Sequence, residues 1–248
     1  MKTIGAQLYT VREQLNTPDQ ARETIARIKE LGYESVQLFG SVTQAKLFAQ
    51  AAREAEMPIV GLLSDLGNCE QEQEALFSLC QEYGIGDIGI SCGPLDDAGA
   101  KAFIPRVNSF AKKAREAGFT FSYHNHGHEF IRTDCGKTVM ELFLEGFDPA
   151  LVDFMPDTYW IHDGGFDVRR FLELAAGRVK ILHLKDLKRT AQGHTFAEIG
   201  SGNLYFPGIL KLAEEIGVEH LVVEQDICER DPLECLKKSV GYLRDLTY

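Results

Sequence analysis

The chain has 248 residues, of which 44% are hydrophobic and 25% are charged, a composition typical of a globular protein with a full core. Its 26 Lys and Arg and 37 Asp and Glu leave a formal net charge of −11, which disfavours nucleic acid and anionic lipid as partners and favours small molecules. No run of about 18 apolar residues is present to span a bilayer, and the first ten residues lack the pattern of a signal peptide, so we expect a cytoplasmic protein.

The cysteines and the loop composition give no sign of a metal ribbon or of a domain boundary. No two cysteines form a CxxC pair, so we expect reduced thiols rather than a zinc ribbon or a disulfide framework. No proline-rich, serine-rich or low-complexity linker interrupts the chain, which predicts a single domain over residues 1–248. The six cysteines are Cys69, Cys80, Cys92, Cys135, Cys228 and Cys235.

Short apolar segments alternate with longer amphipathic segments along the chain, which predicts a strand followed by a helix eight times. The predicted strands cover residues 4–10, 35–40, 58–64, 87–93, 119–125, 151–157, 179–186 and 220–226. The predicted helices cover residues 17–32, 43–56, 69–84, 100–118, 136–147, 167–178, 203–217 and 232–246.

Glycines support this division, because Gly32, Gly118 and Gly217 each stand where a helix should end before the next strand. Eight strand-helix units in about 250 residues match the size of a (β/α)8 TIM barrel of the α/β class. A doubly wound open sheet is the alternative. In a barrel, the catalytic residues collect at the carboxyl ends of the strands, so polar residues at these positions are candidates for a site.

Residue types that bind metal ions occur at or just beyond the carboxyl ends of the last four predicted strands. Alternation along a strand places His183 and Lys185 on one face, directed into the barrel mouth, and the same parity applies to Glu224 in the last strand. Asp157 ends the sixth strand, and Glu129 lies just beyond the fifth. Three carboxylates and one imidazole suit Mn²⁺, Mg²⁺ or Co²⁺ better than a structural zinc site. The alternative is a purely structural ring of ion pairs around Lys185.

Several segments together resemble the xylose isomerase-like TIM barrel superfamily, in its sugar phosphate isomerase/epimerase branch. They are IGAQLYTVREQL, LGYESVQLFG, YHNHGHEF, PDTYWIHDGGFD, ILHLKD, FAEIGSGNL and VVEQDICERDPLE, which extend over nearly the whole chain. The chain departs from the pattern at Gln37 and Ser64, where relatives often carry glutamate and histidine.

The resemblance implies one divalent metal ion (Mn, Mg, Co or Zn) in a cup that accepts a polyol or keto-sugar. Its ligands would be Glu129, Asp157, His183 and Glu224. Substrate-binding residues would be His126, Lys185 and Glu198, and Trp160 could stack on a sugar ring or simply pack.

We therefore expect a metal-dependent carbohydrate isomerase or epimerase that moves a proton next to a carbonyl, with Glu129 and Glu224 as the catalytic acid and base. A dehydratase or lyase acting on a keto-cyclitol or 3-keto-sugar is one alternative, and a non-catalytic sugar-binding barrel is another. A DNA-cutting barrel of the endonuclease IV type is disfavoured, because QLFGS and LLSDLGN lack the additional histidines and the chain is acidic. The exact substrate and any homo-oligomer stay open.

Overall fold

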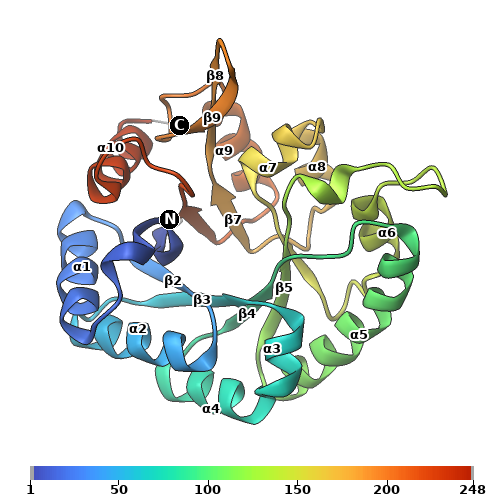
Figure 1. Cartoon of the computed structure of the whole chain (residues 1–248), viewed down its shortest axis with the longest axis horizontal. Coiled ribbons are helices and arrows are strands. Elements are labelled where there is room, and N and C mark those ends of the chain that lie inside the picture. Colours follow the sequence, from blue (N-terminus) through green and yellow to red (C-terminus); the bar gives the residue numbers. More distant parts are fainter. Residues whose placement is uncertain (1–2, 247–248) are drawn as a thin grey trace.

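Eight parallel strands form a nearly closed barrel with helices outside it, as the alternation of segments predicted (Figure 1). The structure is a computed structural model that describes residues 3–246. The strands of the barrel are β1 (Thr3–Gln7), β2 (Ser35–Phe39), β3 (Ile59–Ser64), β4 (Asp87–Ile90), β5 (Thr120–His124), β6 (Asp153–Met155), β7 (Ile181–Leu184) and β10 (His220–Val223).

The order of the strands is β6-β5-β4-β3-β2-β1-β10-β7, and two isolated parallel bridges join the ends of this sheet. These bridges pair Phe154 with Val179 and Asp157 with His183. The second bridge brings the carboxyl ends of β6 and β7 together, which places two of the predicted metal ligands side by side. The closed order excludes the doubly wound open sheet.

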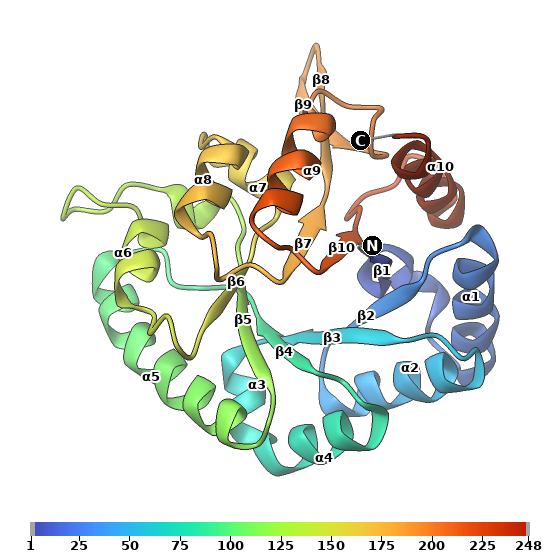
Figure 2. The ribbon, with the colours of Figure 1, turned by 180° about the vertical axis from the view of Figure 1, so that it is seen from behind.

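Helices surround the barrel in the view from the opposite side as well (Figure 2). They are α1 (Pro18–Leu31), α2 (Val42–Glu54), α3 (Leu66–Gln71), α4 (Gln73–Tyr83), α5 (Asp97–Glu116), α6 (Val139–Gly146), α7 (Thr158–Asp163), α8 (Val168–Leu174), α9 (Phe206–Glu215) and α10 (Pro232–Asp245). The 3-10 helices are η1 (Leu8–Gln14) and η2 (His128–Phe130). Among residues 3–246, no helix is both long enough and apolar enough to cross a lipid bilayer.

Local sequence signals define many helix ends. Ser41 and Gln44 form a capping box at the start of α2, and Thr138 and Glu141 form another at the start of α6. Gly32 ends α1 with a φ of 97°, a left-handed conformation that glycine adopts without steric cost. These ends confirm that each helix stops where a turn must return the chain to the barrel.

The alternation of side chains along each strand separates two apolar regions. Leu182 and Leu184 of β7 belong to the large core between strands and helices. Ile181, on the other face of β7, packs inside the barrel with Met155 and Val222. The inward and outward directions predicted for the side chains of β7 are therefore confirmed. The inner apolar cluster lies below the side chains that are directed into the mouth of the barrel.

A β-hairpin between β7 and α9 was not predicted. It consists of β8 (Asp186–Thr190) and β9 (Gly193–Ala197), which pair antiparallel and project from the barrel in Figure 1. The buried carboxylate of Asp186 accepts hydrogen bonds from the backbone N–H groups of Gly200, Gly202 and Leu204, at 3.0, 2.9 and 3.2 Å. The glycine-containing segment after the hairpin is therefore a turn wrapped around a protein carboxylate.

The first and last helices, α1 and α10, lie next to each other, and Tyr33, which follows α1, forms a hydrogen bond with α10. Its buried hydroxyl donates a hydrogen bond of 2.8 Å to the carbonyl oxygen of Leu236 in α10. Burial raises the pKa of Tyr33 well above its ordinary value, so the hydroxyl keeps its proton.

Tyr33→Phe should lower the free energy of unfolding by about 1 kcal/mol, because it removes one buried hydrogen bond and no apolar volume. For a chain of this size that loss corresponds to a fall in Tm of about 2–4 °C. The matched control is Tyr205→Phe at an exposed ring. Equal melting temperatures for the two variants, measured by calorimetry, would contradict a stabilising role for the Tyr33 hydroxyl.

Candidate functional site

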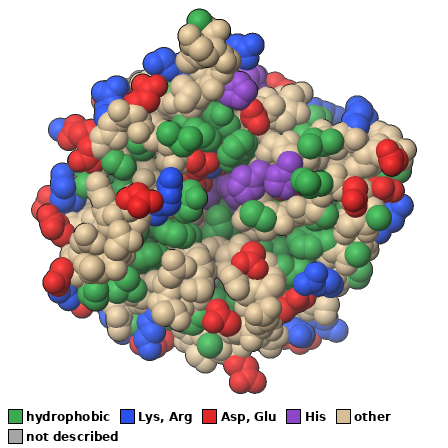
Figure 3. Space-filling view, in the orientation of Figure 1, with side chains coloured by type: hydrophobic (Ala, Val, Ile, Leu, Met, Phe, Trp, Pro, Cys, Tyr) green, Lys and Arg blue, Asp and Glu red, His purple; other side chains and the backbone are tan. Residues whose placement is uncertain are grey.

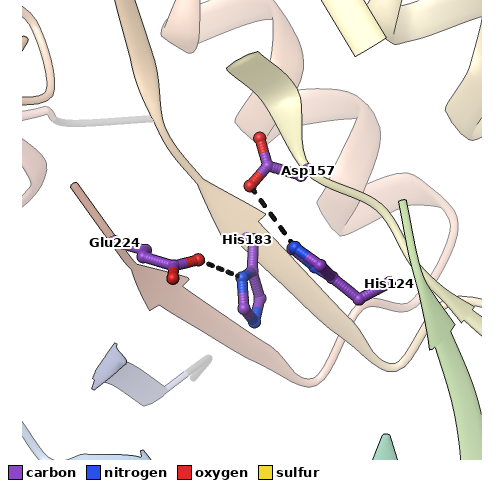
Figure 4. A group of neighbouring side chains, drawn as sticks. All are labelled: His124, Asp157, His183 and Glu224. Carbon is purple, nitrogen blue, oxygen red and sulfur yellow. Dashed lines mark hydrogen bonds and ion pairs between the residues drawn. The ribbon is translucent and has the colours of Figure 1, made fainter. Parts of the chain in front are cut away.

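Four buried side chains converge at the carboxyl ends of neighbouring strands (Figure 4). His124 is the last residue of β5, Asp157 follows β6, His183 lies in β7 and Glu224 follows β10. Each offers one nitrogen or oxygen atom, and these atoms all lie within 4.8 Å of one another. We call these residues the mouth cluster. Strand-end positions thus predicted three of its four members.

The hydrogen bonds of His183 favour one tautomer of its ring. Its Nε2 lies 2.6 Å from Oε1 of Gln37, and that oxygen also accepts a bond of 2.6 Å from Nε2 of Gln7. Because an amide oxygen only accepts, Nε2 of His183 carries a proton. The other nitrogen, Nδ1, lies 2.9 Å from Oε2 of Glu224. These two atoms therefore share a proton in the absence of a cation, and a divalent ion bound to both would replace that proton.

The ammonium group of Lys185 lies among three carboxylates. Its Nζ is 3.0 Å from Asp157 Oδ2, 3.1 Å from Glu224 Oε2 and 3.0 Å from Asp226 Oδ1. Burial acts to lower the pKa of Lys185, but these three neighbours raise it above its ordinary value. Burial likewise acts to raise the pKa of Glu224, yet Lys185 and His183 hold it below its usual range. Lys185 and Glu224 are therefore both charged at neutral pH.

The charges of this group do not balance. With all three carboxylates ionised, Asp157, Glu224 and Asp226 carry three negative charges against one positive charge on Lys185. Burial raises the pKa of Asp226 to about 6 and lowers the pKa of His124 well below its ordinary value, so His124 adds no positive charge. Burial also raises the pKa of Asp157 above its ordinary value. The surplus of negative charge and the set of oxygen and imidazole donors both fit one divalent cation.

Glu129 lies in a second group, with His126 and His128. The Tyr123 hydroxyl donates to Glu129 Oε1 at 2.5 Å, and the backbone N–H of His126 donates to Oε2 at 2.8 Å. Burial raises the pKa of Glu129 above its ordinary value. The structure thus brings Asp157, His183 and Glu224 together, with His124 in place of Glu129 as the fourth member.

A cavity of about 470 Å³ opens over the mouth cluster. One side of the cavity is lined by His124, His126, Lys185, Glu224 and Asp226. The other side has apolar contributions from Tyr9, Phe39, Leu63 and Ile227. Figure 3 shows histidine side chains gathered in the hollowed centre of this face, between hydrophobic groups. A cavity of this size holds a small sugar or cyclitol.

The remaining predicted substrate residues lie in different places. His126 and Lys185 line the cavity, and Trp160 lies beside both. The ring centroid of Trp160 is 5.4 Å from that of His126 and 5.6 Å from Nζ of Lys185. Glu198 lies outside this lining, in a smaller pocket where it pairs with Arg230 at 3.1 Å and Lys238 at 3.5 Å.

Two residues of the site carried a sequence signal that strand-end reasoning did not use fully. In β5, Phe121 and Tyr123 pack outward in the large core, whereas Ser122 and His124 alternate with them and are also buried. This parity directs His124 into the mouth. Asp226 shares the face of Glu224 by the same rule.

Comparison with known proteins identifies relatives of this barrel. The sequence model of the family described as xylose isomerase-like TIM barrel matches residues 25–246. Inosose dehydratase from Mesomycoplasma hyopneumoniae (strain 7448) is 27% identical over 159 residues, which cover 56% of this chain and 52% of that protein. The chain therefore spans about half the length of the curated relatives it matches.

Solved structures share the fold over almost the whole chain. A sugar phosphate isomerase/epimerase from Parabacteroides distasonis superposes with a TM-score of 0.84 at 22% identity, covering 99% of each chain. A xylose isomerase-like TIM barrel protein from Mycobacterium smegmatis, in complex with magnesium, superposes with a TM-score of 0.72 at 15% identity, covering 98% of this chain and 96% of the other.

Lys185→Met should lower the free energy of unfolding by about 3–5 kcal/mol when chelator is present, because it leaves buried carboxylates without their ammonium partner. Urea unfolding followed by circular dichroism measures the change. Lys180→Met is the matched control, since the side chain of Lys180 is 47% exposed and, among residues 3–246, its ion pair is with Glu219 at 3.7 Å. Equal losses in the two variants would show that the contacts of Lys185 do not stabilise the fold.

Proposed function

Since the chain belongs to the xylose isomerase-like TIM barrel family, we propose that it is a divalent-metal-dependent isomerase or epimerase of a small keto-sugar or polyol. The observation that carries this proposal is the mouth cluster, with its surplus of negative charge, at the base of a cavity of sugar size. The solved structure of a family member in complex with magnesium supports a metal in this family of barrels.

Asp157, His183 and Glu224 would hold the metal ion, and Mn²⁺, Mg²⁺, Co²⁺ or Zn²⁺ are all compatible with these donors. The fourth ligand is either His124, which is in the mouth cluster, or Glu129, whose oxygens are bonded to Tyr123 and to the backbone of His126. When bound, the metal supplies positive charge that stabilises negative charge developing on a substrate oxygen.

The residues of the chain would bind the substrate and move its proton. Lys185 and His126 line the cavity and would donate hydrogen bonds to substrate oxygens, whereas Trp160 lies outside the cavity lining and would hold the His126 ring in place. Glu224, ionised beside Lys185, would take the proton from the carbon next to the carbonyl. Glu129, whose pKa burial raises, would deliver a proton to the other side of that carbon or to its neighbour.

A dehydratase is the second candidate, and the similarity to inosose dehydratase favours it. The first step would be the same removal of a proton next to the carbonyl by a carboxylate. The hydroxyl on the adjacent carbon would then leave with a proton as water, and a double bond would form between the two carbons. Keto-cyclitols and 3-keto-sugars both carry the required hydroxyl next to the acidic C–H bond.

Removal of the imidazole should show whether the mouth cluster binds metal. His183→Ala should weaken Mn²⁺ binding about 100-fold or more, because it removes a ligand and frees Glu224 from its contact. His162→Ala, at an exposed histidine outside the site, is the matched control. Calorimetric titration measures both, and equal affinity in these two variants would refute the metal site.

The same titration can identify the fourth ligand. If His124 binds the metal, His124→Ala should weaken Mn²⁺ binding by about 10-fold or more, whereas Glu129→Gln should change it less than about 3-fold. The reverse order would assign the fourth position to Glu129. Tyr123→Phe then provides a further check, since it removes the Tyr123 hydrogen bond from Oε1 of Glu129 and leaves the His128 contact at 3.3 Å and the mouth cluster in place.

Incubation with ketohexoses and with inosose in D₂O tests the reaction. We expect deuterium to enter next to the carbonyl in the wild type, and Glu224→Gln and Glu129→Gln to slow exchange by about 100-fold or more at equal metal occupancy. Glu145→Gln, on an exposed helix face, should exchange at the wild-type rate. A product with a new absorbance of a conjugated enone would indicate dehydration, and a barrel that binds sugars without any exchange would be a non-catalytic binding protein.

A further inference from the structure

We propose that Asp226 is a positioning residue for the metal site, because it holds the ammonium of Lys185 while the carboxylates of Asp157 and Glu224 turn to a divalent cation. The inference rests on the proposed metal site. It adds a role for a residue that would itself contact neither the metal nor the reacting atoms. Lys185 and Asp226 would then act as a pair that sets how strongly the mouth binds a cation.

The backbone of Lys185 is fixed, so only its side chain can respond to a bound cation. The Thr158 hydroxyl donates to the carbonyl oxygen of Lys185 at 2.7 Å and accepts from its backbone N–H at 2.9 Å. The side chain of Lys185 is 2% exposed, and the ring of Trp160 lies 5.6 Å from Nζ. The ammonium can therefore move only within the space between its three carboxylates.

Those three carboxylates differ in what else they can do. Asp157 and Glu224 belong to the mouth cluster, and each touches Lys185 through a single oxygen, at 3.0 and 3.1 Å. Asp226 lies outside the cluster, and both of its oxygens face Nζ, at 3.0 and 3.2 Å. It is also the most accessible of the three, with a side chain that is 19% exposed compared with 0% for Asp157 and 5% for Glu224.

A divalent cation on Asp157 and Glu224 would repel the nearby ammonium and compete for the oxygens that it contacts. An ammonium has three donors, and both side-chain hydrogen bonds from Lys185 Nζ go to Asp226, whereas Asp157 and Glu224 contact it as ion pairs. Asp226 alone can accept from two of these donors. It can therefore keep the ammonium paired and desolvated when the other two carboxylates are withdrawn, which lowers the free-energy cost of metal binding.

This role has a thermodynamic signature that a simple negative charge lacks. If Asp226 acted only by attracting the cation over distance, its removal would weaken binding equally whether Lys185 is present or not. If Asp226 acts by holding Lys185, its removal matters only while the lysine is there. A double-mutant cycle separates the two cases.

The experiment is calorimetric titration of Mn²⁺ into the whole chain as wild type, Asp226→Asn, Lys185→Met and the double variant. We expect Asp226→Asn to weaken binding about 10-fold and Lys185→Met to strengthen it about 10-fold. Adding Asp226→Asn to Lys185→Met should change the affinity less than about 3-fold. Asp226→Glu should restore most of the wild-type affinity, because it returns a carboxylate to the ammonium.

Glu229→Gln is the control for loss of a negative charge elsewhere in the same loop, since Glu229 is exposed and the structure shows no contact between it and Lys185. It should leave the Mn²⁺ affinity within about 2-fold of the wild type, as expected for an exposed charge that solvent and salt screen. Lys185→Gln repeats the cycle with a polar neutral side chain if Lys185→Met does not fold.

Additive effects of the two substitutions, or weaker binding in Lys185→Met and Lys185→Gln, would overturn the role of Asp226 while leaving the metal site intact. Absence of Mn²⁺ binding in the wild type and in both lysine variants would refute the metal site itself, and this inference with it. The two failures are therefore distinguishable.

Discussion

The contact between one buried ammonium and three carboxylates controls the chemistry of this barrel mouth. Charged groups leave water only when other charges or hydrogen bonds compensate them, and Lys185 compensates its neighbours incompletely. The remaining negative charge creates the demand for a cation. The same ammonium keeps Asp157 and Glu224 in place without a metal, so the fold and the candidate site depend on one interaction.

The barrel makes this arrangement possible by separating polar and apolar side chains. Inward-facing Met155, Ile181 and Val222 fill the interior below the mouth, whereas charged side chains such as Lys185 and Glu224 line the cavity above it. Outward-facing residues of the same strands, such as Leu182, pack under the helices. A one-residue shift in any of these strands would place the carboxylate or imidazole in the large core, which explains why the site depends on strand register.

The sequence predicted the parts of the site that follow from strand periodicity. His183 and Glu224 are directed inward by a period of two, and Asp157 lies two residues beyond the end of the short strand β6. Glu129 lies in the 3-10 helix η2, where that period no longer applies, so its bonds to Tyr123 and to the His126 backbone could not be anticipated. The hairpin β8–β9 was missed because its residues form a two-stranded ribbon outside the barrel, with polar residues on much of its surface. The position of Glu198 was misjudged for the same reason, since it follows β9 and meets Arg230 rather than the cavity.

Gln37 lies beside the mouth cluster and belongs to this charge balance. Its amide oxygen accepts from both Gln7 and His183, and it carries no charge into the mouth. A carboxylate at this position would add a further buried negative charge beside His183, at a free-energy cost that the neutral amide avoids. The amide oxygen accepts the proton on Nε2, which leaves Nδ1 directed at Glu224 and adds no charge to the mouth.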